Sequence, residues 1–144
     1  GVRVSELVSL QAEDAAQGFR DIYSKGGKMR RIYFPESLRQ EALPWLQEAG
    51  LNTGFIFTNR RGAPITPRGI HSQLKVLAKR YGIPEKTVYP HAFRHRFAIN
   101  FLDKFNDISL LADLLGHDSV ETTKIYLTKS SEEQRELIDS IVTW

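Results

Sequence analysis

Apolar residues recur at helical spacing along most of the chain. Most of these segments are bounded by a residue type that favours a helix start or end, such as Pro, Ser, Asp or Gly. The predicted helical segments are the end of a helix within Val2–Leu10, Pro35 to about Ala49, Thr66 to near Gly82, Pro90 through Leu102, Asp107 or Ser109 to Gly116, a short segment from Ser119 that carries Tyr126, and Ser130 through Ile141.

Two short segments, residues 19–23 and 31–34, alternate apolar and polar positions instead, which is typical of strands. They flank a Gly-Gly pair, a strong signal for a hairpin turn, so Lys25 is expected at the hairpin tip. Residues 55–57, Phe-Ile-Phe, predict one more short buried strand. The predicted fold is a mostly helical α+β domain with a small antiparallel sheet near its N-terminus.

The length of 144 residues favours one domain with a sizeable core. No apolar run approaches the 18 or more residues of a membrane span, and the absence of cysteine excludes disulfides and thiolate metal sites. The absence of cysteine also leads us to expect an intracellular setting. Because the chain begins with Gly1 rather than Met, we expect a fragment of a longer protein.

Positive charge is clustered, although the formal net charge is only +3. Acidic residues gather instead between residues 132 and 139. Any single basic cluster could be an ordinary solvated face, but four of them favour a polyanionic partner, with nucleic acid as the leading candidate. The basic clusters are Lys25, Lys28, Arg30 and Arg31; Arg60, Arg61 and Arg68; Lys75, Lys79 and Arg80; and Arg94 and Arg96.

Side chains suited to phosphoryl transfer lie near the end of the chain. His91 and Arg94 are three residues apart on one predicted helix, so both project from the same face. Arginine offers a planar fork that matches phosphate oxygens, and histidine can donate a hydrogen bond or move a proton near neutral pH. His117 and Tyr126 follow, and a tyrosine becomes a useful nucleophile only beside cations or a base.

Each candidate has an ordinary structural explanation when it is taken alone. Arg3 could simply pair with Glu6 at a spacing of three residues, and Tyr126 could be a core tyrosine. A metallonuclease is disfavoured because no carboxylate or histidine cluster has ligand spacing and His71 stands alone. We therefore expect no metal and no cofactor.

Five motifs occur together and in a fixed order along the chain. The chain resembles the catalytic domain of the tyrosine recombinases, the phage integrase family, over nearly its whole length. The motifs are Gly-Val-Arg-Val-Ser-Glu-Leu at residues 1–7, Ser-Lys-Gly-Gly-Lys-Met-Arg-Arg at 24–31, His-Ala-Phe-Arg-His-Arg-Phe-Ala at 91–98, Leu-Leu-Gly-His-Asp-Ser-Val-Glu-Thr-Thr at 114–123 and Ile-Tyr at 125–126.

The resemblance implies a role for each of these residues. Arg3 and Arg94 would bind the scissile phosphate, and Tyr126 would be the nucleophile. Lys25 would be the general acid. Lys28 is the alternative for this role, because the sequence does not fix which residues pair across the hairpin. The remaining implied residues are His91 and His117 at the phosphate, Glu6 in support, and Arg30 and Arg31 on the DNA backbone. From the basic clusters themselves, we also expect DNA-backbone contacts by Arg60, Arg61, Arg68 and Arg96.

The activity implied is cleavage and rejoining of double-stranded DNA through a 3′-phosphotyrosyl intermediate. It would belong to a recombinase or integrase of a phage or other mobile element, in the cytoplasm and at the nucleoid of a bacterial host. Residues 1–144 would be the catalytic domain, without the family's N-terminal core-binding domain. The family implies a tetramer on DNA, although the fragment alone could be monomeric.

Two other functions and one structural alternative stay open. The same residue types serve type IB topoisomerases, and a DNA-binding module on this fold could have lost cleavage. The hairpin-to-tyrosine layout and the His-x-x-Arg motif favour the recombinase. The segment from Ser130 to Trp144 could dock on a neighbouring protomer, as in the family, or pack on its own domain.

Overall fold

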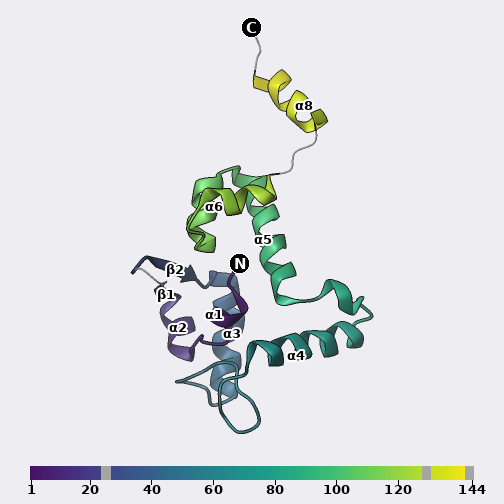
Figure 1. The fold of residues 1–144 in the computed structure, drawn as a ribbon. Coiled ribbons are helices and arrows are strands. Elements are labelled where there is room, and N and C mark those ends of the chain that lie inside the picture. The colour runs from purple at the N-terminus through teal and green to yellow at the C-terminus, as the bar shows by residue number, and fades with distance from the viewer. Residues whose placement is uncertain (24–26, 128–130, 142–144) are drawn as a thin grey trace. The chain divides into compact units, whose positions relative to one another are not determined.

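The computed structural model describes residues 1–23, 27–127 and 131–141 (Figure 1). Helices make up most of this part of the chain and two strands form a hairpin, so the predicted mostly helical α+β fold is confirmed. The chain divides into two compact units, Gly1–Phe97 and Ala98–Trp144. We call them unit 1 and unit 2 and describe each by itself.

Unit 1 contains the hairpin and the helices of the first two thirds of the chain. Its elements are α1 (Val4–Leu7), α2 (Ala12–Gln17), β1 (Phe19–Tyr23), β2 (Met29–Tyr33), α3 (Glu36–Glu48), α4 (Pro67–Arg80), the 3-10 helix η1 (Glu85–Thr87) and the first half of α5 (Pro90–Phe105). Unit 2 contains the rest of α5, α6 (Ile108–Leu115), α7 (Val120–Thr123), the 3-10 helix η2 (Lys124–Tyr126) and α8 (Ser131–Ile141).

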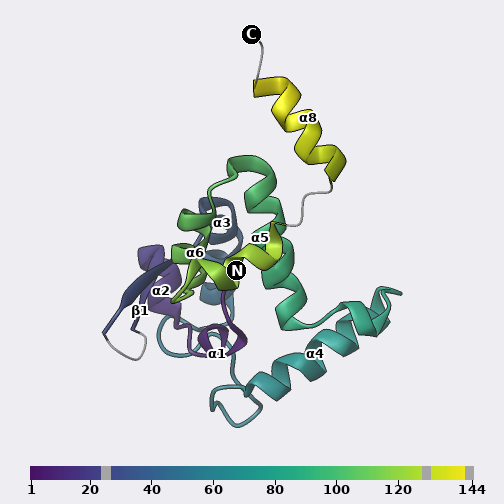
Figure 2. The ribbon, with the colours of Figure 1, turned by 45° about the horizontal axis from the view of Figure 1, so that its top comes forward.

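The hairpin pairs β1 and β2 antiparallel, with Phe19 opposite Tyr33 and Tyr23 opposite Met29. Helix α2 lies beside both the hairpin and α3 (Figure 1, Figure 2). Ala12, Ala15 and Leu46 are buried between these helices and form one core of the chain. The expected position of Lys25 at the hairpin tip lies outside the described residues.

Helix α2 was not expected from the sequence. The Gln11 backbone N–H donates to Asp14 Oδ2 at 2.8 Å, and the buried Ala12 and Ala15 lie on one face at a spacing of three residues. Six residues are too few to establish a helical period, and Gln is not among the preferred N-cap residues. The acceptor Asp14, at the third helical position, was the one local signal of a helix start.

The prediction of a strand at residues 55–57 is wrong. Phe55 forms only an isolated antiparallel bridge to Gln11, and bends follow it. Gly54, with φ of 82°, turns the backbone immediately before that bridge. Ile56 packs against the core of α2 and α3, so side-chain burial accounts for the apolar triplet without a strand ladder.

Helices α3, α4 and α6 begin and end within two residues of the expected positions, whereas α5 continues past Leu102 to Phe105. At the start of α4, Thr66 Oγ1 accepts a hydrogen bond from the Gly69 N–H at 3.1 Å. Asp107, rather than Ser109, caps α6 by accepting from the Leu110 N–H at 2.9 Å. Gly116, with φ of 65°, ends α6 in the left-handed conformation that glycine adopts most easily.

Unit 2 has its own apolar core, built where α5 meets α6. Tyr126 and Leu127, at the end of η2, pack against this core, so the segment after α7 is held to the body of the unit. The fully or nearly buried members are Ala98, Leu102, Leu111 and Leu115, with Phe101 and Ile108 packed around them. Among the described residues, no helix combines the length and the apolar character that a membrane crossing requires.

Replacing Leu111 by Ala should destabilise the protein by about 2–5 kcal/mol, because the side chain is fully buried and its removal leaves a cavity. Leu110→Ala is the matched control on the same helix, since Leu110 is 47% exposed, and it should cost less than about 1 kcal/mol. Urea unfolding of both variants measures the difference. Equal losses would contradict the assigned core.

Candidate functional site

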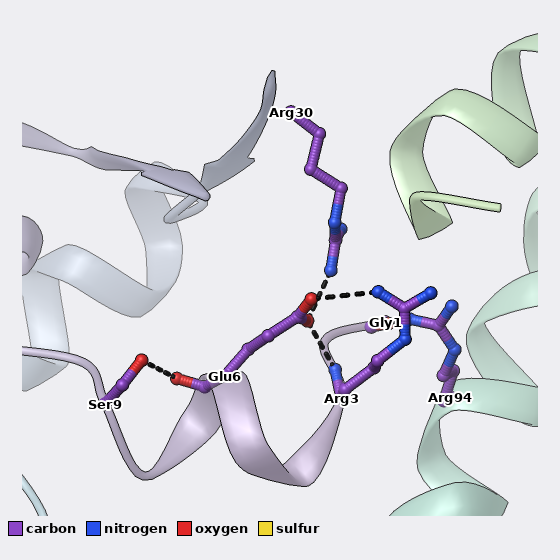
Figure 3. A network of polar contacts seen from close by, with 6 residues as sticks. All are labelled: Gly1, Arg3, Glu6, Ser9, Arg30 and Arg94. Carbon is purple, nitrogen blue, oxygen red and sulfur yellow. Dashed lines mark hydrogen bonds and ion pairs between the residues drawn. The ribbon is translucent and has the colours of Figure 1, made fainter. Parts of the chain in front are cut away.

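The carboxylate of Glu6 is the centre of a polar network in unit 1 (Figure 3). Its Oε2 accepts the Arg3 backbone N–H at 2.7 Å, and its Oε1 accepts Arg3 Nη1 at 3.1 Å. Arg30 Nη2, reaching from β2, donates to the same Oε2. Glu6 is 7% exposed, so this anion is almost removed from water and is compensated by two guanidinium groups.

The surroundings of Glu6 favour its charged form. Burial raises the pKa of the Glu6 carboxyl, but the hydrogen bonds from Arg30 and the Arg3 backbone, together with the positive charges of both arginines, outweigh burial. The resulting pKa is below the ordinary glutamate value. Glu6 is therefore ionised at neutral pH and holds the two arginines in place.

Arg94 is brought to the start of the chain from α5. Its side chain is buried, with 4% of the residue exposed, and its Nη1 donates to the Gly1 carbonyl at 2.6 Å. The Arg94 guanidinium is therefore held beside the first residues of the chain.

Arg30 and Arg31 are neighbours in sequence but point to different partners. Arg31 pairs with Asp21 through two hydrogen bonds of 2.7 and 2.9 Å and stacks on the Phe19 ring at 3.9 Å. The pair raises the pKa of Arg31 and lowers that of Asp21. Both arginines were expected on the DNA backbone, whereas the structure engages both in ion pairs within the fold.

The other cationic candidates of unit 1 lie at the surface. His91 is exposed, one helical turn before Arg94 on α5, and Lys28 is exposed just before β2. Lys25 lies outside the described residues. The exposed arginines that remain as candidates for DNA contact are Arg60, Arg61, Arg68 and Arg96.

Unit 2 carries the two remaining candidates, His117 and Tyr126. His117 follows Gly116, its backbone N–H donates to the Ala112 carbonyl at 2.9 Å, and its ring is half-buried. Its Nδ1 lies 2.7 Å from the hydroxyl oxygen of Thr123. Tyr126 is half-buried against the core of unit 2.

Thr123 is a residue of the site that sequence reasoning missed. It is 0% exposed, yet it is polar and touches a candidate histidine. Nothing in the Thr122-Thr123 pair distinguishes the buried member from the exposed one without the position of the helix. Among the residues that the structure describes, no group of three or more His, Asp or Glu side chains is arranged to hold a metal ion.

The arrangement in unit 1 suits the binding of an oxyanion. Three guanidinium groups and one carboxylate lie in the network, which leaves an excess of positive charge. Arginine is always ionised at physiological pH and can donate two parallel hydrogen bonds to phosphate oxygens. Because Glu6 and Gly1 already orient these side chains, little ordering is required when an anion arrives.

Comparison with family models matches residues 1–133 to the phage integrase family. Among curated proteins, the chain is similar to the tyrosine recombinase XerC of Leptospira interrogans (serogroup Icterohaemorrhagiae, serovar copenhageni, strain Fiocruz L1-130). The two are 37% identical over 142 residues, which cover 95% of this chain and 45% of the relative. The chain thus spans about half the length of that curated relative.

Two solved structures are similar to the chain in three dimensions. The crystal structure of XerA recombinase has a TM-score of 0.76 and 28% identity, and the match covers 99% of this chain and 52% of that one. The pre-cleavage complex of XerH site-specific recombinase bound to difH substrate has a TM-score of 0.72 and 25% identity, with 95% and 42% covered.

Replacing Glu6 by Gln should lower the free energy of unfolding by about 3 kcal/mol at pH 7, because a nearly buried ion pair loses its anion. The folded-state pKa of Glu6 is lowered, so its contribution is complete above the unfolded pKa of about 4.3 and is lost as the pH falls through the folded value. Urea unfolding across this range should show the two proteins converging in acid.

Glu41→Gln is the matched control for this prediction, since Glu41 is an exposed glutamate of α3. Its substitution should change the stability by less than about 0.5 kcal/mol at any pH tested. A loss in Glu6→Gln that persists undiminished below pH 3, or no loss at pH 7, would contradict the proposed role of the carboxylate.

Proposed function

This chain belongs to the phage integrase family, and on that premise we propose that it carries the catalytic groups of a site-specific DNA recombinase. The reaction is cleavage and rejoining of double-stranded DNA through a 3′-phosphotyrosyl intermediate. The observation that carries the proposal is the cluster of Arg3, Arg30 and Arg94 ordered around Glu6 and Gly1.

The proposed chemistry is two transesterifications. The Tyr126 hydroxyl loses its proton to a base or to solvent as its oxygen attacks the phosphorus, the bond to the 5′ oxygen breaks, and a general acid protonates that leaving oxygen. A 5′ hydroxyl of a partner strand then loses its proton and attacks the same phosphorus, the bond to Tyr126 breaks, and the tyrosine oxygen takes up a proton. One phosphodiester replaces another in each step, so the reaction needs no nucleoside triphosphate.

Arg3 and Arg94 are assigned to the non-bridging oxygens of the scissile phosphate, where negative charge increases in the transition state. Donors that are already oriented stabilise such charge more than donors that must first be ordered. His91 and His117 add further donors. Glu6 supports the site through Arg3 and Arg30, so we assign Arg30 to positioning rather than to a DNA contact.

Double-stranded DNA is the proposed partner. XerH, one of the solved structures similar to this chain, is a site-specific recombinase bound to its difH substrate. The exposed side chains of Arg60, Arg61, Arg68 and Arg96 are the proposed contacts to the phosphate backbone, which position a protein on DNA without reading the sequence. Binding should therefore weaken with increasing salt.

Two further features complete the proposal. Exchange of strands between two DNA sites requires several protomers, so we propose a homotetramer on DNA. The bacterial relative supports a bacterial source, and a phage or other mobile element within such a host is the origin that we propose. The protein would then act at the nucleoid.

Incubating the full-length protein with a library of randomised duplexes, each with a single nick, should give a covalent protein–DNA adduct that survives denaturation in detergent. The nick lets the short cleaved strand diffuse away and traps the intermediate. Tyr126→Phe should abolish the adduct, because the nucleophilic oxygen is absent. Arg94→Lys should slow its formation by roughly 10²–10³-fold, as for loss of an oriented donor.

Tyr81→Phe, at a tyrosine that is 71% exposed, is the control and should leave the adduct unchanged. An adduct that survives Tyr126→Phe would overturn the nucleophile assignment. DNA binding without any adduct would indicate a non-cleaving module. Adduct formation with relaxation of supercoils, but without exchange between two sites, would indicate a topoisomerase-like enzyme.

Lys25→Ala should slow cleavage of ordinary DNA but not of DNA with a sulfur at the bridging 5′ position. A thiolate leaves without protonation, so it does not need a general acid. Lys28→Ala serves as the comparison, and cleavage rates on both substrates are the measurement. Rescue of Lys28→Ala by the sulfur substrate, in place of Lys25→Ala, would transfer the role to Lys28.

A further inference from the structure

The His117 ring is bonded through one of its two nitrogens to a hydroxyl that water does not reach. Nδ1 of His117 lies 2.7 Å from Thr123 Oγ1, and Thr123 is 0% exposed. Within the described part of the chain, His117 is the one hydrogen-bond partner recorded for this hydroxyl. The pair lies entirely within unit 2.

The burial of Thr123 decides the direction of the hydrogen bond. A hydroxyl has one proton to donate, and a buried donor left without an acceptor is costly. If Nδ1 carried the proton, the Thr123 hydroxyl would accept it and its own proton would have no recorded acceptor. The favoured arrangement has Thr123 Oγ1–H donating to an unprotonated Nδ1, so the ring proton of neutral His117 lies on Nε2.

We propose that Thr123 is a positioning residue that fixes His117 as the Nε2–H tautomer, with Nε2 as the donor to the scissile phosphate. This inference rests on the proposed function and names the group that sets the state of one of its histidines. The other ring nitrogen of a functional histidine commonly determines which nitrogen is protonated. Here a threonine hydroxyl makes the hydrogen bond to the ring that a carboxylate or a backbone carbonyl often makes.

The hydrogen bond also ties two parts of the site together. His117 lies in the connection after α6, while Thr123 ends α7 and directly precedes η2, which ends at Tyr126. The bond therefore closes the seven-residue segment 117–123 and holds the histidine to the helical segment that carries the proposed nucleophile. Loss of the hydroxyl should affect the orientation of His117 before it affects the fold.

Nitrogen NMR of the full-length protein with 15N-labelled histidine tests the tautomer directly. At pH 8, above the ordinary imidazole pKa of about 6.5, His117 should show an unprotonated Nδ1 and a protonated Nε2. His117→Asn identifies its signals among the four histidines. Thr123→Ser should keep the tautomer, and Thr123→Val, similar in shape but without a hydroxyl, should give a mixture.

The effect of the Thr123 hydroxyl on activity is tested by single-turnover cleavage, with the nicked duplex sequences that formed adducts in the library experiment as substrates. Thr123→Val should slow adduct formation by about 10-fold or more, as for partners that orient functional histidines elsewhere, and Thr123→Ser should restore most of the rate. In the His117→Ala background, Thr123→Val should cause no further loss. Thr122→Val, at the exposed neighbour, is the control and should leave the rate unchanged.

A protonated Nδ1 in the unaltered protein would overturn the proposal, and this result does not depend on any variant folding. Equal losses from Thr123→Val with and without His117 would also overturn it, since Thr123 would then act on the fold alone. If the unaltered protein forms no adduct, the proposed function fails, while the NMR measurement still decides the tautomer.

Discussion

The Glu6 carboxylate is the interaction on which the arrangement of unit 1 depends. It accepts hydrogen bonds from the backbone and side chain of Arg3, just before α1, and from Arg30 of the hairpin. Without this anion, guanidinium groups of like charge would repel one another in a partly desolvated place. The carboxylate lets the fold hold several cations close together while an excess of positive charge remains.

The excess of positive charge around Glu6 connects the fold to the proposed chemistry. Arg3 and Arg94 are 91 positions apart in sequence and both lie beside Gly1, because α5 brings Arg94 to the first residues of the chain. Donors held in advance lower the barrier of a reaction that increases charge on phosphate oxygens. Thr123 serves the same end in unit 2, since its hydroxyl fixes one ring nitrogen of His117.

Signals confined to a few residues predicted the longer helices, although not α2, because caps such as Asp107 and Gly116 act locally. The sequence also predicted the pairing of Arg3 with Glu6 through their spacing. Contacts between residues far apart in sequence could not be predicted in this way. No signal in the neighbouring residues predicted that the Arg30 side chain pairs with Glu6. The alternation of a strand predicts only that Arg30 and Arg31 face opposite sides, and Arg31 pairs with Asp21.

The measurement that tests the account most directly is the identity of the residue joined to DNA. Trapped adducts can be digested with protease and nuclease, and the linked peptide sequenced by mass spectrometry. The account predicts a single phosphotyrosyl peptide containing Tyr126, attached to a 3′ phosphate. Attachment through another residue, or to a 5′ phosphate, would contradict it.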